Sequence, residues 1–146
     1  MFTGIIEAQG TLVALRHEGT NVHLDVRAPF TSSLQIDQSV AHDGVCLTVV
    51  AIEGDVYTVT AIEETLAKTH LGSCEVGHAF NLERCAVVGD RIDGHVVQGH
   101  VDTTGTLASV ETRDGSWILT IEHPHSMEWM TVPKGSIPLS GISLTV

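Results

Sequence analysis

The sequence has 146 residues, of which 42% are hydrophobic and 17% charged, and its formal net charge is -11. No apolar run approaches the roughly eighteen residues of a membrane span. Nucleic acids and anionic membrane surfaces repel a chain of this charge, so both are excluded as main partners, which leaves small molecules and other proteins.

The three cysteines, Cys46, Cys74 and Cys85, are odd in number and lack CxxC spacing. This favours reduced thiols in a cytosol over a disulfide framework. The N-terminus has no basic region followed by an apolar stretch, so we expect no export signal and a cytoplasmic location.

Alternation of apolar and polar side chains predicts a series of short strands. The clearest is VHLDVR at 22–27, which alternates without a fault, as a half-buried strand does. Further strands are predicted at 4–14, 38–42, 45–52, 55–61 and 79–86, with turn residues between them. Two short helical turns are predicted, one at 31–34 with Thr31 as its N-cap and one at 63–68.

An internal repeat organises the chain. GVCLTV at 44–49 returns as GISLTV at 141–146. A shift of 95 residues lays 4–12 over 99–107 and 21–29 over 116–124, and a shift of 97 lays 39–49 over 136–146. The sequence therefore predicts one unit of about 95 residues followed by half of another, with no counterpart of 50–94.

Six short antiparallel strands with one apolar face bury that face best by closing into a small barrel. We therefore predict an all-β fold of tandem duplicated, six-stranded, antiparallel, Greek-key-like barrels, the second incomplete in this chain. The predicted domains are 1–94 and 95–146, joined near 90–94. We expect 95–146 not to fold alone, because Trp117, Leu119 and Ile121 would lack a complete core.

Seven motifs carry a resemblance to a known family. They are MFTGII, SVAHDGVCLTV, EETL, NLER, DGHVVQGHVD, KGSI and GISLTV, in the order and spacing of the riboflavin synthase family of lumazine-binding repeat proteins. The resemblance implies a transferase that dismutes two 6,7-dimethyl-8-ribityllumazine molecules by four-carbon transfer, giving riboflavin and 5-amino-6-ribitylamino-pyrimidinedione. The alternative is a non-catalytic lumazine- or riboflavin-binding protein of the same repeat family.

The resemblance also explains the duplication, because a reaction between two copies of one substrate needs two similar pockets. It implies a homotrimer at full length, with the site between subunits, and association with lumazine synthase as a further partner. Holding both reactants face to face is worth up to roughly 7 to 11 kcal/mol of barrier. No metal, flavin or nucleotide cofactor is implied.

Motif positions imply two substrate pockets, one for each repeat, with Ser39 as a further substrate-binding candidate. The first would be lined by Gly4, Ile5, Ile6, Cys46, Leu47, Thr48, Thr60, Ala61, Ile62, Glu63, Glu64 and Thr65. The second would be lined by Gly99, His100, Val101, Lys134, Ser143, Leu144 and Thr145. Residues i and i+2 of a strand share a face, so Cys46 and Thr48 should project together.

Four residues are candidates for catalysis. His100 would take a proton from the acidic C7 methyl group of the lumazine, or it is an ordinary strand histidine. Cys46 would add to C7 or polarise it, or it is inert packing. Phe2 would stack on the ring or only plug the barrel mouth, and Ser143 would orient the second substrate.

Nine histidines raise the question of a metal ion. His123 and His125 would share a strand face, and His95 and His100 lie close in sequence, but neither pair has a third ligand at convincing spacing. We therefore predict no metal site. Neither GxGxxG nor a P-loop occurs, so nucleotide chemistry has no support.

Overall fold

The computed structural model describes residues 1–126 and 129–146. Almost all regular structure is strand. In chain order the elements are β1 (Ala8–Glu18), β2 (Asn21–Arg27), the 3-10 helix η1 (Thr31–Ser33), β3 (Ser39–His42), β4 (Val45–Glu53), β5 (Val56–Ala61), α1 (Glu63–Lys68), the 3-10 helix η2 (His70–Ser73), β6 (Ala79–Arg84), β7 (Thr106–Arg113), β8 (Ser116–Glu122), β9 (Ser136–Leu139) and β10 (Ile142–Thr145).

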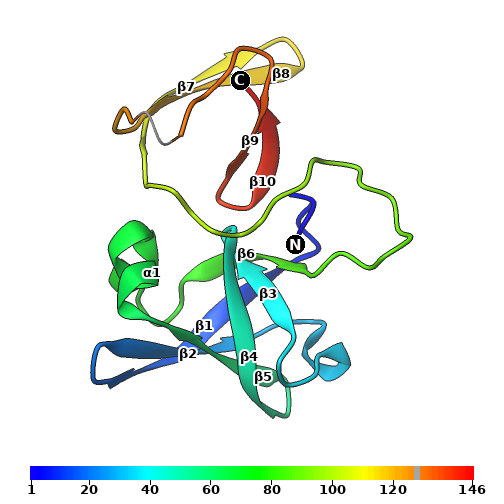
Figure 1. The fold of residues 1–146 in the computed structure, drawn as a ribbon, viewed down its shortest axis with the longest axis vertical. Coiled ribbons are helices and arrows are strands. Elements are labelled where there is room, and N and C mark those ends of the chain that lie inside the picture. Colours follow the sequence, from blue (N-terminus) through cyan, green and yellow to red (C-terminus); the bar gives the residue numbers. More distant parts are fainter. Residues whose placement is uncertain (127–128) are drawn as a thin grey trace.

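The first repeat is a closed antiparallel barrel in the order β1-β2-β5-β4-β3-β6 (Figure 1). Strand β2 lies beside β5 rather than β3, which gives the Greek-key connection. In β2 and β5 every second side chain is buried, as the alternating sequence predicts. Tyr57, Phe80 and Leu24 are among the large side chains that fill the barrel. The predicted all-β barrel is therefore confirmed.

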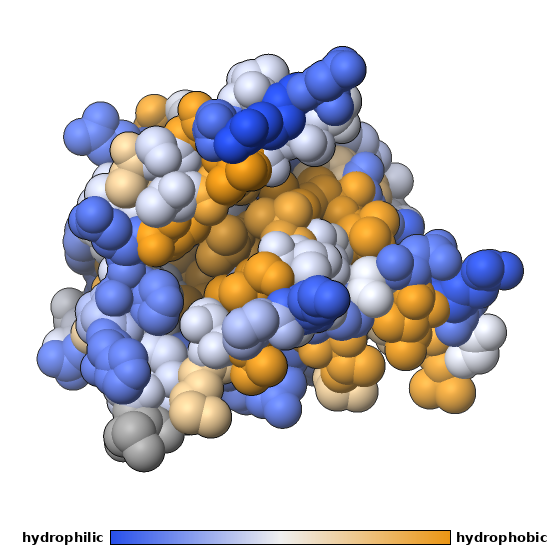
Figure 2. Space-filling model, turned by 90° about the horizontal axis from the view of Figure 1, so that it is seen from above, coloured by the Kyte–Doolittle hydropathy of each residue, from blue (hydrophilic) through white to orange (hydrophobic). Residues whose placement is uncertain are grey.

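The second repeat forms two separate two-stranded sheets, β7–β8 and β9–β10, that lie beyond one end of the barrel (Figure 1). Trp117 and Leu119, expected to line a second core, are 71% and 42% exposed. Seen from the side of β7 and β8, the surface is hollowed and apolar side chains gather in the hollow (Figure 2). This half is an incomplete barrel, as predicted.

Backbone details confirm the repeat more sharply than the sequence does. Strand β1 has a register shift between Leu12 and Ala14, and β7 has one between Leu107 and Ser109, which are the equivalent positions. Equivalent residues also share positive φ angles, for example Asp37 at 71° and Lys134 at 64°. The two repeats therefore share these backbone features at equivalent positions.

Two local predictions need correction. Strand β1 begins at Ala8 rather than at residue 4: Glu7 N–H still donates to Leu82 O of β6, but Gly4 O accepts from Ser143 N–H of the second repeat. The N-cap of η1 is Phe30 rather than Thr31, whose hydroxyl donates to the Ala28 carbonyl at 2.9 Å. Helix α1 lies where it was predicted, whereas η2 was not predicted. Within the described residues, no helix is long and apolar enough to span a membrane.

Candidate functional site

The leading segments of the two repeats pair with each other. Phe2 and Val97, which are equivalent positions, form an antiparallel bridge: Phe2 N–H donates to Val97 O at 2.7 Å and Val97 N–H to Phe2 O at 2.9 Å. Both side chains are buried, at 2% and 6% exposure. The bridge therefore lies between the repeats, on the axis that approximately relates them.

Beyond this bridge, the leading segment of each repeat contacts the other repeat. Cys46 N–H donates to Gly99 O at 2.8 Å, and Ser143 N–H donates to Gly4 O at 2.8 Å. Cys46 and Ser143 are equivalent positions of the repeated hexapeptide. Each hexapeptide therefore pairs with the leading segment of the other repeat.

Glycine is required at both crossings. Gly4 and Gly99 have φ angles of 76° and 85°, in the region that other residues rarely adopt. A Cβ on Gly4 would lie 2.7 Å from Ser143 Cβ, and one on Gly99 would lie 2.6 Å from Cys46 Cβ. The two repeats approach closely because these positions carry no side chain.

The sequence predicted that Gly4 and Cys46 line one pocket and that Gly99 and Ser143 line the other, and the structure shows the opposite pairing. Gly4 and its neighbours lie at Ser143 rather than at Cys46, and Gly99 lies at Cys46 rather than at Ser143. Val101 accordingly packs against the core of the first barrel. Aligning the repeats shows which positions are equivalent, but not which repeat a segment packs against, so the sequence could not reveal the exchange.

The first wall consists of the outward face of β4 and its neighbours. Cys46 is half-buried and Thr48 exposed, while the alternate residues Val45, Leu47 and Val49 are buried in the barrel, which confirms the shared face. Leu47 can therefore offer a ligand only its backbone. Ser39 is the strand partner of Thr48.

The end of β5 and the start of α1 hold the other predicted residues of this wall. The Thr60 hydroxyl bonds His23 Nδ1 at 2.9 Å, and Ala61 is fully buried. Ile62, Glu63 and Glu64 are exposed and Thr65 is half-buried. Thr60 and Ala61 thus contribute to the barrel itself, and Ile62, Glu63 and Glu64 are accessible to a ligand.

The second wall is the equivalent face of the second repeat, around Ser143 of β10. It contains a hydrogen-bonded pair of side chains that the sequence did not reveal. His95 Nδ1 lies 2.7 Å from the Ser143 hydroxyl, and both residues are half-buried. His100 is exposed and directly follows Gly99 in the chain, and Leu144 is half-buried. The available signal was the DGHVVQGHVD motif, which contains both histidines. Lys134 and Thr145 are exposed.

Glu83 fastens the crossing segment to the barrel. This carboxylate is 5% exposed; Oε1 accepts from Thr3 N–H at 2.6 Å and from the Thr3 hydroxyl at 2.7 Å, and Oε2 accepts from Gly4 N–H at 3.0 Å. A buried carboxylate with three donors holds the backbone in one place.

We expect Glu83→Gln to lower the free energy of unfolding by about 1 to 3 kcal/mol, because the amide NH2 would face a backbone N–H. Urea unfolding measures the loss, and faster hydrogen exchange at Gly4 locates it. Glu53→Gln, at the exposed end of β4, is the control. Equal stability of the two variants would show that Glu83 does not hold the segment.

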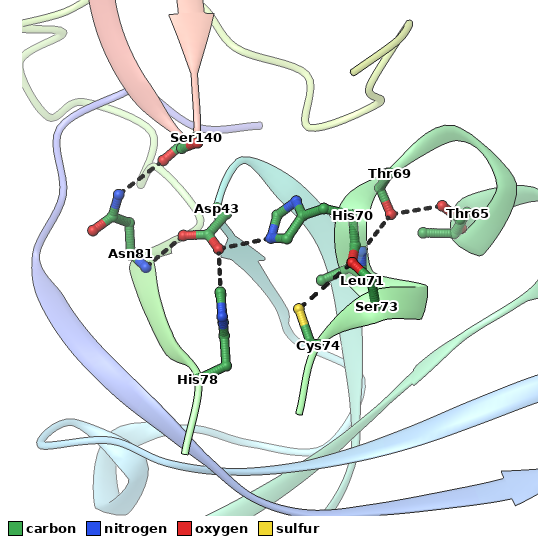
Figure 3. Close-up of polar contacts among 10 residues, drawn as sticks. All are labelled: Asp43, Thr65, Thr69, His70, Leu71, Ser73, Cys74, His78, Asn81 and Ser140. Atoms are coloured by element: carbon green, nitrogen blue, oxygen red, sulfur yellow. Dashed lines mark hydrogen bonds and ion pairs between the residues drawn. The ribbon is translucent and has the colours of Figure 1, made fainter. Parts of the chain in front are cut away.

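A second polar link joins the repeats behind the walls. Asp43 Oδ1 accepts from Asn81 N–H at 2.7 Å, and Asn81 Nδ2 donates to the Ser140 carbonyl at 3.1 Å (Figure 3). Burial opposes ionisation of Asp43, but hydrogen bonds from His70, Asn81 and His78 outweigh it and lower its pKa. The anionic turn therefore stays fixed against the second repeat.

The chain is similar to known proteins over both repeats. The lumazine binding domain family matches residues 3–85 and 98–146. The riboflavin synthase of Mycobacterium tuberculosis is 40% identical over 148 residues, covering all of this chain and 74% of that protein. The riboflavin synthase of Escherichia coli is 36% identical over 151 residues, covering all of this chain and 70% of that protein.

The fold has solved counterparts. Crystal structures of LumP complexed with 6,7-dimethyl-8-(1'-D-ribityl) lumazine and with riboflavin match with TM-scores of 0.86 and 0.87, at 22% identity, over 99% of this chain and 79% of LumP. At that identity the likeness is one of fold. With the family match and the full-length relatives, the chain belongs to the lumazine-binding domain family, and within it to the riboflavin synthases.

Proposed function

We propose that this chain catalyses the dismutation of two 6,7-dimethyl-8-ribityllumazine molecules to riboflavin and 5-amino-6-ribitylamino-pyrimidinedione. The observation that carries the proposal is the pair of equivalent walls, each with a small polar side chain, Cys46 or Ser143, beside a crossing glycine. Two copies of one substrate need two such walls. The riboflavin synthase relatives support the same activity.

The two walls differ in ways that would make one substrate a donor and the other an acceptor. The first wall offers the Cys46 thiol and the exposed His100, and the second offers the Ser143 hydroxyl held by His95. A neutral imidazole can accept a proton from the C7 methyl group, and we assign this role to His100. Phe2 is 2% exposed beneath Gly99, so we assign it to packing at the crossing rather than to stacking on a ring.

The proposed active site lies between subunits of a homotrimer, in the cytoplasm, where the first wall of one subunit faces the second wall of another. We propose lumazine synthase as a further partner. The remaining predicted binding residues, from Ser39 and Thr48 to Lys134 and Thr145, would surround the ribityl chains and pteridine rings of the two lumazines. No cofactor is needed for this reaction, because one lumazine supplies the four carbons that the other receives.

Turnover tests the proposal directly. The intact protein should convert dimethylribityllumazine to riboflavin, and His100→Gln should slow turnover about tenfold or more while lumazine binding changes little, since a proton acceptor is lost. His17→Gln, exposed near the end of β1, is the matched control. Wild-type rates in His100→Gln would remove His100 from the proposed chemistry.

The second candidate is a protein that binds lumazine or riboflavin without turnover. The likeness to LumP, which was crystallised with both molecules, favours it. Saturable binding of dimethylribityllumazine with no riboflavin formed would establish this candidate and contradict the first. Riboflavin formation would reject it.

A further inference from the structure

Three potential metal ligands converge beside the first barrel, in the segment that runs from η2 to β6. One ligand atom from each of His70, Cys74 and His78 lies within 4.8 Å of those of the other two. His70 begins η2, Cys74 follows it, and His78 precedes β6. The expectation of no metal site considered only pairs of histidines and overlooked this group, in which a cysteine stands midway between two histidines.

The backbone between these residues is fixed by packing and hydrogen bonds. Leu71 is fully buried in the barrel core and anchors η2. Cys74 N–H donates to Leu71 O at 3.3 Å, and His78 N–H donates to Glu75 O at 3.0 Å. Gly77 turns the chain with a φ of 98°. The three side chains therefore meet without ordering a loop, so little conformational entropy opposes binding of an ion.

One buried carboxylate holds both imidazoles. Asp43 Oδ2 accepts from His70 Nε2 at 3.0 Å and from His78 Nε2 at 3.1 Å (Figure 3). The Asp43 side chain is 8% exposed and comes from the turn between β3 and β4. Histidines that bind metals are commonly oriented by such a carboxylate, which also offsets the charge of the cation.

The group lines a cavity of about 370 Å³ that is an open depression of the surface, formed by His70, Ser73, Cys74, Glu75, Val76 and His78. The two histidine side chains are 38% and 34% exposed, so an ion can reach them from solvent. The cavity is large enough for an ion and for water in a remaining coordination position. Two partly exposed imidazoles and a buried thiol thus line an open depression.

The donor set selects the class of ion. Two nitrogens and a sulfur suit Zn²⁺ and exclude Ca²⁺ and Mg²⁺, which prefer oxygen ligands. Ligand atoms around a tetrahedral zinc lie roughly 3.3 to 3.8 Å apart, so the side chains need to close by at most about 1 to 1.5 Å. The partly exposed histidines can make this movement within the cavity.

We propose that His70, Cys74 and His78 bind one Zn²⁺ ion, with Asp43 as the orienting carboxylate and water in the open position. On binding, the Cys74 thiol leaves its hydrogen bond to the His70 carbonyl and releases its proton to solvent, while each imidazole keeps its Nε2–H on Asp43 and binds through Nδ1. The site is structural: it ties η2 to the segment before β6, and Asp43, which both imidazoles contact, is linked through Asn81 to Ser140 of the second repeat. The proposal does not depend on the proposed enzymatic activity.

Cobalt(II) tests the site in the purified protein after removal of metal by chelation. Titration with Co²⁺ should give a thiolate-to-cobalt charge-transfer band that saturates at one ion per chain and disappears when Zn²⁺ is added. Cys74→Ser should abolish the band and weaken zinc binding about tenfold or more in competition with a chromogenic chelator. Cys85→Ser, which changes an exposed cysteine, should leave both unchanged.

Circular dichroism shows whether Cys74→Ser folds, and His78→Gln, a change at a partly exposed side chain, gives an independent measure. His78→Gln should also weaken zinc binding about tenfold or more. Wild-type protein without the charge-transfer band would overturn the proposal. So would an undiminished zinc affinity in His78→Gln.

Discussion

Gly99→Ala is expected to lower the free energy of unfolding by about 3 kcal/mol and to weaken binding of riboflavin or lumazine. The methyl group would lie 2.6 Å from Cys46 Cβ and 2.9 Å from Phe2 Cε2, inside van der Waals contact. Holding alanine at a φ of 85° costs about 1 to 2 kcal/mol. Displacing the segment also loses the bond from Cys46 N–H to Gly99 O, worth about 1 kcal/mol.

A matched variant separates backbone strain from crowding. Gly115 has a φ of 78°, and a Cβ there meets no atom within 4 Å. Gly115→Ala should therefore lose only the strain, about 1 to 2 kcal/mol, and should leave ligand binding unchanged. Urea unfolding and a fluorescence titration with riboflavin measure both effects. Equal stabilities and equal affinities of the two variants would mean that the close approach at Gly99 has no role.

Much of the first barrel follows from local patterns. The alternation in VHLDVR and the turn residues after His42 and Glu53 place strands and turns correctly, because burial of one face fixes which residues are apolar. The repeated hexapeptide predicts the second half from the first. Equivalent bulges and equivalent positive φ angles accompany the repeat, even where the residues differ, as at Asp37 and Lys134.

The crossing and the cluster around Asp43 could not be predicted in the same way. Phe2 pairs with Val97, and Gly4 and Gly99 then each bond to the other repeat. The spacing of apolar residues does not indicate which repeat an extended segment will contact. Asp43 meets His70 and His78 across a turn and a 3-10 helix, where neither helical nor strand spacing applies. Sequence reasoning therefore identified the glycines and Cys46 as candidates but not the partners that position them.

Acid should destabilise the protein through His42, which burial keeps neutral. His42 is fully buried, and burial lowers its pKa to about 4 from an ordinary value of 6.5. Its Nδ1 lies 3.1 Å from Val40 O and its Nε2 lies 2.8 Å from the Tyr57 hydroxyl, whose pKa burial raises. The carbonyl can only accept, so Nδ1 carries the proton and Nε2 accepts from Tyr57.

The sign follows from proton uptake. Between pH 6.5 and 4 the unfolded chain protonates His42 while the folded chain does not, so unfolding takes up a proton and stability falls as the pH falls. The stabilisation is complete above pH 6.5, and its loss by pH 4.5 amounts to about 2 to 3 kcal/mol.

His42→Gln keeps a neutral donor and acceptor but cannot titrate. Between pH 7.5 and 4.5, the free energy of unfolding of His42→Gln should therefore fall by about 2 to 3 kcal/mol less than that of the wild type. Urea unfolding at pH 7.5 and at pH 4.5 measures the difference. His17→Gln should follow the wild type, because His17 is exposed. If wild type and His42→Gln lose the same stability over this range, acid acts through other groups and the buried pair of His42 and Tyr57 does not set the limit.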